Sequence, residues 1–238
     1  VDPDSLTLVG SKESALLTIA HEGHYDALAL RCWPEWQSEF QRAPCSTLGR
    51  LNQQGIPTAC EGDALGALGM LLLSGLASAP ATLLDMIAFD PGDESLLLWH
   101  CGPTAASLAD EEGLQLILQF NQRVPVANDL VFRKEHGTML QILGDGKRFF
   151  LMDGEGLGRE KPSYDGSRGW FTSLRMNRSP VSLLDVINTL MSHGLMHHHV
   201  LALGVHTEAT LEVASWLGLE ALQPVPYSHR KPLASELR

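Results

Sequence analysis

The chain has 238 residues, 44% of them hydrophobic and 19% charged, which is enough apolar material for one large domain or two modest ones. Its formal net charge is −11, and we find no stretch with an excess of Lys and Arg. A surface that binds phosphate needs such an excess, so the composition argues against nucleic acid or an anionic membrane and favours a small neutral or cationic ligand.

Residues 1 to about 90 alternate between helical and extended patterns. Apolar residues at helical spacing predict helices, and short apolar runs between them predict strands. This alternation is typical of βα units around a parallel sheet, so we expect an α/β arrangement. The expected helices span residues 11–23, 45–55 and 64–78, and the expected strands span residues 26–32, 57–60 and 81–89.

Residues 64–84 form an uncharged run of 21 residues, which by length alone could cross a bilayer. Ser74, Ser78 and Pro80 interrupt it, and four glycines in and just before the run lower its helix propensity. We therefore predict a buried helix followed by a strand, and no membrane span. The glycines would let the helix lie close to a neighbour.

The signals change after residue 90 to short strands with glycine-rich turns, as in residues 144–158 and 169–176. We expect a β-barrel or sandwich that carries two late helices. The first is predicted to be capped by Ser179, with Pro180 at its first position, and to end near Gly194. The second is predicted over 207–218, with a strand over 200–205 between the two.

Four cysteines, Cys32, Cys45, Cys60 and Cys101, show no C-x-x-C pair and no dense disulfide spacing. They are predicted to be buried thiols in a reducing compartment, which favours the cytoplasm. No signal peptide is visible. The chain begins with Val, so we expect a piece of a longer protein.

Three acidic residues are candidates for chemistry. Glu61 lies between a predicted strand and a predicted helix, where free backbone N–H groups and the helix dipole favour a carboxylate. Asp63 is best explained as the N-cap of that helix. Asp85 interrupts the apolar strand over 81–89, where a buried carboxylate needs an Arg or a metal ion as its partner, unless it reaches solvent at the strand end.

A histidine tract precedes the strand over 200–205. Alternate strand residues face opposite ways, so His197 and His199 are predicted on one side and His198 on the other. His193 lies further upstream. A single such histidine is more often a core residue than a ligand, and no zinc-finger spacing accompanies the tract. Two carboxylates with one imidazole would suit Mn²⁺ or Mg²⁺.

Other catalytic signatures are absent from the sequence. The run "GEGLG" at 154–158 has the wrong spacing for a dinucleotide site, and neither a Walker A loop nor a G-x-S-x-G elbow occurs. Cys60 and Cys101 are poor candidates for nucleophiles, because His100 stands too close to Cys101 for the usual base geometry.

Five segments in order, "ALRCWPEW", "PTACEGDALGALGMLLL", "LLDMIAFD", "LLLWHCG" and "HHHVLALG", resemble the C-terminal half of the L-fucose isomerase family. In that family a Glu in an E-x-D turn and an Asp 24 residues later bind the metal, and Glu61 and Asp85 stand at that interval. A His at the start of the late strand is the third ligand. The alignment places it at His198, with His197 and His199 as alternatives.

The resemblance also implies a fold and an assembly. Residues 1–90 would be the C-terminal part of an α/β/α middle domain, and residues 91–238 a C-terminal β-barrel domain with helices. The full-length family forms homo-oligomers, hexamers or trimers. Family members are about twice as long as this chain, so it would be a C-terminal portion.

The implied activity is metal-dependent aldose–ketose isomerisation through a cis-enediol, of the L-fucose/L-fuculose or D-arabinose/D-ribulose type. Mn²⁺ or another divalent cation would be held by Glu61, Asp85 and His198, with the two acids also serving as the acid/base pair. Trp33, Trp99 and His197 are the candidates for contact with a monosaccharide. The tryptophans, Trp36 included, are equally plausible as core residues.

Two alternatives stay open. A catalytically inactive sugar-binding or regulatory module of the same fold would have no need of a complete metal set. A zinc hydrolase built on the histidine tract would not depend on Glu61.

Overall fold

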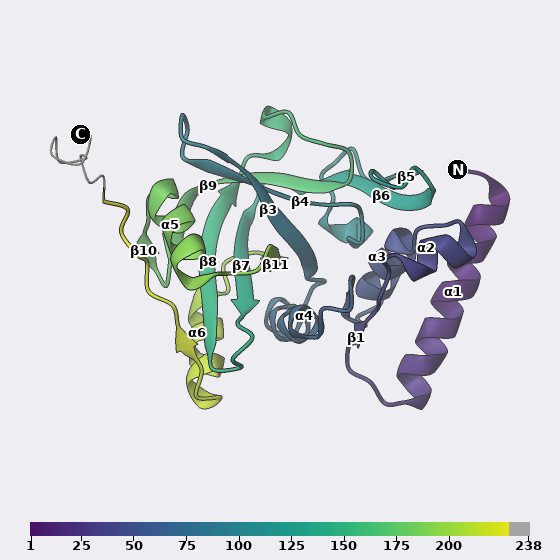
Figure 1. Ribbon diagram of the computed structural model, residues 1–238, viewed down its shortest axis with the longest axis horizontal. Coiled ribbons are helices and arrows are strands. Elements are labelled where there is room, and N and C mark those ends of the chain that lie inside the picture. The colour runs from purple at the N-terminus through teal and green to yellow at the C-terminus, as the bar shows by residue number, and fades with distance from the viewer. Residues whose placement is uncertain (229–238) are drawn as a thin grey trace, which may run out of the picture.

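The computed structural model describes residues 1–228 (Figure 1). Its helices are α1 (Pro3–Glu22), α2 (Glu35–Phe40), α3 (Cys45–Gln53), α4 (Ala64–Ala77), α5 (Leu183–His193) and α6 (Thr207–Trp216), with 3-10 turns η1 (Ala106–Leu108) and η2 (Gly158–Glu160). Its strands are β1 (Leu28–Ala29), β2 (Thr58–Ala59), β3 (Thr82–Asp90), β4 (Ser95–His100), β5 (Gln115–Leu118), β6 (Pro125–Val131), β7 (His136–Ile142), β8 (Arg148–Gly156), β9 (Ser167–Met176), β10 (Ser179–Pro180), β11 (His198–Leu203) and β12 (Glu220–Ala221).

Six antiparallel strands form a closed barrel in the order β8, β7, β11, β3, β4 and β9, and the pairing of β9 with β8 completes the ring. Strands β6 and β5 extend it beside β9, and β12 adds to β8. Closure leaves the ring without free edges. The predicted β-barrel with flanking helices is confirmed.

The barrel interior is packed around Phe171 of β9, which is fully buried. Glycines make room for its ring. A Cβ on Gly137 would lie 2.9 Å from Phe171 Cε1 and 2.7 Å from Leu201 Cδ1, and a Cβ on Gly169 would lie 3.2 Å from Phe171 Cε2 and 2.8 Å from Phe132 Cδ2. Since interiors tolerate no such overlap, these strands need glycine here for the large ring to fit.

Helices cover different parts of the barrel. Helix α5 contributes Leu183, Val186 and Leu190 to the same hydrophobic cluster as Phe171. Helix α4 packs between β11 and β7 on one side and β1 and β2 on the other, within a second cluster. Figure 1 shows α4 between the barrel and the α1–α3 unit.

The glycines of α4 allow the close approach that the sequence predicts. A Cβ on Gly69 would lie 3.0 Å from Val200 Cγ2 of β11. The predicted helix over 64–78 matches α4, whose N-cap is Asp63. None of the helices within residues 1–228 combines the length and the apolar character needed to cross a bilayer.

Some local predictions are wrong. Helix α5 is capped by Ser182 rather than Ser179, because Ser179 and Pro180 pair with β9 as the short strand β10. The predicted strand over 26–32 is only two residues long, and its parallel partner β2 is equally short. A three-layer α/β/α domain stays a prediction, as does a boundary near residue 90. Strand β3, on the N-terminal side of that boundary, is part of the barrel.

We expect Phe171→Ala to lower the free energy of unfolding by about 3–5 kcal/mol, because it removes a ring from a closed interior that cannot collapse around the void. Urea unfolding followed by circular dichroism measures this. The control is Leu118→Ala on β5, where the side chain is 47% exposed and the expected loss is under about 1 kcal/mol. Equal losses for the two variants would contradict the packing described.

Candidate functional site

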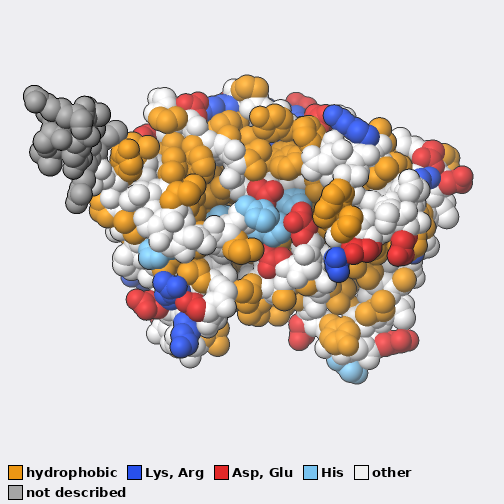
Figure 2. All heavy atoms as spheres, viewed as in Figure 1, with side chains coloured by type: hydrophobic (Ala, Val, Ile, Leu, Met, Phe, Trp, Pro, Cys, Tyr) orange, Lys and Arg blue, Asp and Glu red, His pale blue; other side chains and the backbone are white. Residues whose placement is uncertain are grey.

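The candidate site lies on the outer wall of the barrel, where β11 and β3 face the start of α4. In β11, Leu201 and Leu203 join the interior cluster, while Val200 and Ala202 join the cluster under α4. His198 shares the α4-facing side by the same alternation. Figure 2 shows histidine side chains near the centre of one face, with acidic side chains beside them.

Strand pairing brings His198 and Asp85 together. They are direct partners in the antiparallel register of β11 and β3. Glu61 comes from the turn between β2 and α4. His198 Nε2 lies 3.8 Å from Glu61 Oε2 and 3.7 Å from Asp85 Oδ1. The structure therefore places Glu61 and Asp85 beside His198, the third residue predicted to bind the metal.

That nitrogen has no hydrogen-bond partner within the described part of the chain. His198 is only 5% exposed, and Asp85 Oδ1 is likewise buried without a partner. Such atoms are costly to leave unpaired, and a positive charge between them would satisfy both. The chemistry of this donor set, two carboxylates and an imidazole, fits a divalent cation.

Among residues 1–228, two groups offer ligand atoms that lie within 4.8 Å of one another inside each group. The first is Glu61, His197 and His198, and the second is Cys60, His100 and His198. Asp85 belongs to neither set, although it approaches Nε2 most closely of the carboxylates. His198 is common to both.

Asp63 has a second role that the sequence did not reveal. One carboxylate oxygen accepts the Gly66 amide at 2.7 Å and caps α4, and the other lies 3.0 Å from His198 Nδ1. Burial alone would raise the pKa of Asp63, but the hydrogen bonds from His198 and Gly66 hold it below its ordinary value. An ionised carboxylate only accepts, so Nδ1 carries a proton that it donates to Asp63, and in the neutral ring Nε2 keeps a lone pair that can bind a cation.

The backbone aims Glu61 at this point. Glu61 has φ +59° and Gly62 has φ +73°, so two consecutive residues lie in the left-handed region. A non-glycine residue there carries strain of the kind found at functional sites. The Glu61 amide donates to Cys32 Sγ at 3.3 Å, and the Glu61 side chain is 44% exposed. Solvent therefore reaches the site past Glu61.

His100 was missed as a site residue. Its Nε2 lies 3.2 Å from Cys60 Sγ and 4.0 Å from Glu61 Oε1, and its ring is 5.6 Å from that of His198. Burial raises the pKa of the Cys60 thiol. The signal in the sequence was the histidine at the end of a strongly apolar segment, residues 96–100.

The other residues that the sequence proposed for the site lie in different surroundings. The exposed His197 ring lies 4.3 Å from that of His198, and Trp99 is the register partner of Asp85 on β4. Trp33 is half-exposed on the loop after β1 and has no ring contact or hydrogen bond with the site residues named above. His199 points inward against Phe150, and burial lowers its pKa to about 4. The prediction that His197 and His199 share one side is therefore wrong. Strand β11 begins at His198, so strand alternation does not extend to His197.

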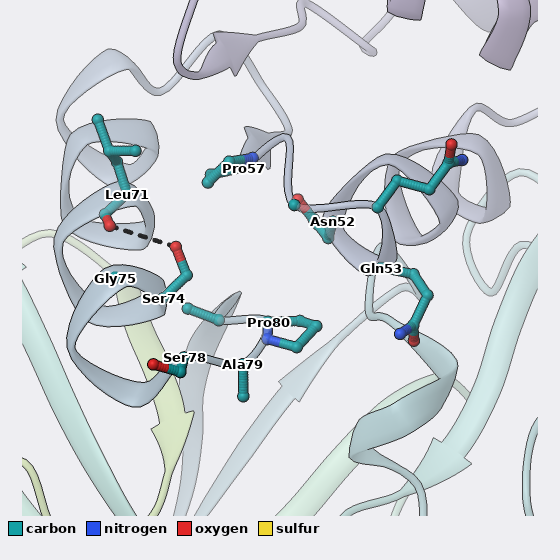
Figure 3. Close-up of a pocket in the computed structure, with 12 residues that line it drawn as sticks. Asn52, Gln53, Pro57, Leu71, Ser74, Gly75, Ser78, Ala79 and Pro80 are labelled. Carbon is teal, nitrogen blue, oxygen red and sulfur yellow. Dashed lines mark hydrogen bonds between the residues drawn. The ribbon is translucent and has the colours of Figure 1, made fainter.

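A cavity of about 500 Å³ lies apart from this site, between the C-terminal ends of α3 and α4 (Figure 3). Its lining includes Asn52, Ser74, Ser78 and Pro80, and it contains no acidic, basic or thiol side chain. It has no group that moves a proton or binds a metal.

The fold and site thus define a β-barrel protein with an acid–imidazole centre on its wall. No family model matches the chain. It is 33% identical over 82% of its length to a sulfoquinovose isomerase of Priestia megaterium, and 32% identical over 84% to one of Alkalicoccus urumqiensis. It is 28% identical over 82% to one of a Clostridium species.

These matches cover only 43–44% of the relatives, so the chain spans less than half the length of the curated relatives it matches. They also correct the resemblance drawn from short segments. The relatives are named sulfoquinovose isomerase, so the assignment to the L-fucose isomerase family is wrong. The homo-oligomer that this assignment implied stays a prediction.

We expect Asp63→Asn to weaken Mn²⁺ binding by about 10- to 100-fold while changing the free energy of unfolding by less than about 1 kcal/mol. Asn caps helices well, but its single oxygen cannot serve both the Gly66 amide and His198. Titration calorimetry and urea unfolding measure the two effects.

The matched control is Ser182→Ala, which removes the cap of α5 far from the site. It is expected to cost about 1 kcal/mol of stability and to leave Mn²⁺ binding unchanged. If Asp63→Asn bound Mn²⁺ as tightly as the wild type, Asp63 would be a cap and nothing more.

Proposed function

We propose that the protein carrying this chain is a sugar aldose–ketose isomerase, and that Glu61, Asp85 and His198 form its reacting centre. The observation that supports this most directly is the convergence of both carboxylates on the buried, unpartnered Nε2 of His198. The isomerase names of the relatives point to the same class of reaction.

Glu61, Asp85 and His198 would hold a divalent cation, with Mn²⁺ or Mg²⁺ as the candidates, because hard oxygen donors with one imidazole suit these ions. When bound, the cation would acidify the hydroxyl and the C–H next to the sugar carbonyl. His198 would bind through Nε2, and Asp63 would hold its ring in the Nδ1–H tautomer.

The carboxylates would move the proton. Conversion of an aldose to a ketose moves a proton from C2 to C1 and another from the O2 hydroxyl to O1, through a cis-enediol. One carboxylate accepts the first proton and the pair delivers the second, so the reaction needs no other reagent. Glu61 is open to solvent and Asp85 is 19% exposed, which gives the two acids different surroundings for these roles.

The substrate proposed first is sulfoquinovose, because the relatives are named sulfoquinovose isomerase. A sulfo-substituted sugar is an anion, whereas the charge of −11 favours a neutral or cationic ligand. D-glucose has the same ring without the sulfonate, so comparing the two sugars tests whether this acidic protein accepts the anion.

We expect Glu61→Gln to lower kcat for sulfoquinovose isomerisation by about 10²- to 10⁴-fold, because the amide can neither accept nor return a proton. An assay of ketose formation measures this. Glu35→Gln, which changes an exposed acid on α2 next to Arg31, is the control and should retain the wild-type rate. Wild-type turnover by Glu61→Gln would overturn the assignment.

We further expect chelation to abolish turnover and stoichiometric Mn²⁺ to restore it, with metal content measured by elemental analysis. Full turnover by metal-free protein would exclude this cation from the reaction. Binding of metal and sugar with no turnover, in a preparation whose barrel is intact by circular dichroism, would instead favour the inactive sugar-binding module.

A further inference from the structure

A second group of metal-binding atoms surrounds the same histidine. One ligand atom from each of Cys60, His100 and His198 lies within 4.8 Å of the other two, and Cys60 Sγ is 3.2 Å from His100 Nε2. The three residues are 2%, 2% and 5% exposed. The function proposed above uses only His198 of this group, so Cys60 and His100 have no assigned role.

Glu61 stands beside this group and would complete it as a fourth donor, although it is not one of the three residues whose ligand atoms all lie within 4.8 Å of one another. Its two carboxylate oxygens lie 4.0 Å from His100 Nε2 and 3.8 Å from His198 Nε2. One sulfur, two imidazole nitrogens and one carboxylate are donors that zinc accepts in four-coordinate sites. A set of four protein donors leaves no position for a substrate, unlike the set made by Glu61, Asp85 and His198.

We propose that Cys60, His100, His198 and Glu61 form a binding site for Zn²⁺, and that zinc bound there excludes the hard cation of the reaction. Exclusion follows because His198 Nε2 has one lone pair and both sites need it. The exclusion rests on the proposed function, whereas the zinc site rests only on the geometry.

The protons in this step balance. Zinc binds the Cys60 thiolate, so the thiol proton leaves to solvent. His100 binds through Nε2 only when its proton is on Nδ1. In the structure Nδ1 accepts a 2.8 Å hydrogen bond from the Cys101 amide, so zinc binding requires the ring to change tautomer and to give up this bond. The new Nδ1–H can then donate a hydrogen bond to Cys101 Sγ, which lies 3.2 Å away. His198 already has its proton on Nδ1, facing Asp63.

The sulfur decides which ion is captured. Thiolate is a soft donor and favours zinc, whereas Mn²⁺ prefers oxygen donors and stands at the weak end of the divalent series. Entry is open on the Glu61 side. The site therefore selects a thiophilic ion, even though two of its four members also belong to the oxygen-rich set.

Metal-free full chain titrated with Zn²⁺ and with Co²⁺ tests the site. X-ray absorption of the Zn²⁺ form should show one sulfur at about 2.3 Å beside nitrogen and oxygen ligands. The Co²⁺ form should show a sulfur-to-cobalt charge-transfer band. Cys60→Ser should lose the band and weaken Zn²⁺ binding at least 100-fold. Cys32→Ser, which changes another buried thiol beside Glu61, should keep both.

Absence of a sulfur ligand in the wild type overturns the zinc site, and this measurement needs no variant. A band that persists in Cys60→Ser, or that disappears in Cys32→Ser, also overturns it. None of these three results affects the isomerase proposal, because none of them involves Mn²⁺ or turnover.

Competition tests the exclusion. Adding one equivalent of Zn²⁺ to the Mn²⁺-loaded protein should release Mn²⁺, seen as the sharp spectrum of the free ion in electron paramagnetic resonance. Asp85→Asn should lose Mn²⁺ binding and retain Zn²⁺ within about threefold. Simultaneous binding of both ions would overturn the exclusion. Failure of the wild type to bind Mn²⁺, with the sulfur ligand present, would instead contradict the proposed function.

Discussion

The site depends on one buried nitrogen atom that has no hydrogen-bond partner in the described part of the chain. His198 Nε2 is buried between two carboxylates, and Asp63 holds the ring so that its lone pair faces them. Leaving a buried polar atom unpaired costs about 1–3 kcal/mol, and Asp85 Oδ1 adds a second such atom. A cation bound between these atoms would pair both of them and remove this unfavourable free energy. The same atom explains why two donor sets compete rather than cooperate.

The start of α4 concentrates the local constraints. Asp63 ends the left-handed turn made by Glu61 and Gly62, caps the helix and holds His198. Gly66 is part of this arrangement, since a Cβ there would lie 2.6 Å from Asp63 Oδ2. That oxygen is the one that faces His198. The same Asp63 side chain therefore caps the helix and orients His198. A substitution that keeps the cap but removes the second oxygen is expected to disturb the orientation of His198.

The sequence predicted what local pattern determines. Helix α4, its cap and the strand after Pro80 follow from spacing, capping chemistry and a helix breaker, and the structure has all three. The register that sets His198 opposite Asp85 joins residues far apart in the chain, and no local pattern encodes it. The resemblance used segments from core strands and turns. Such segments carry the barrel and its acids, but they do not identify the sugar.

The residues that were missed show where this reasoning ends. Asp63 has two oxygens, and only the capping one has a signature in the local sequence. His100 follows an apolar strand, where a histidine is ordinarily a core residue. Only the tertiary structure shows that His100 lies between Cys60 and Glu61. Ser179 was a sound cap by composition, but pairing with β9 took precedence over it.

The position of the site on the barrel wall makes it sensitive to packing between two cores. His198 belongs to β11, and Asp63 and Glu61 belong to the start of α4, so their contact spans the boundary between the barrel and the α4 cluster. Gly69 against Val200 sets how closely the two approach. The barrel is closed and fixes β11 and β3 relative to each other, whereas α4 meets β11 through side-chain packing and the hydrogen bond between Asp63 and His198. A small shift of α4 would separate Asp63 and Glu61 from His198 before it disturbed the His198–Asp85 pair. If a cation binds at the proposed site, its affinity therefore depends on the packing of one helix.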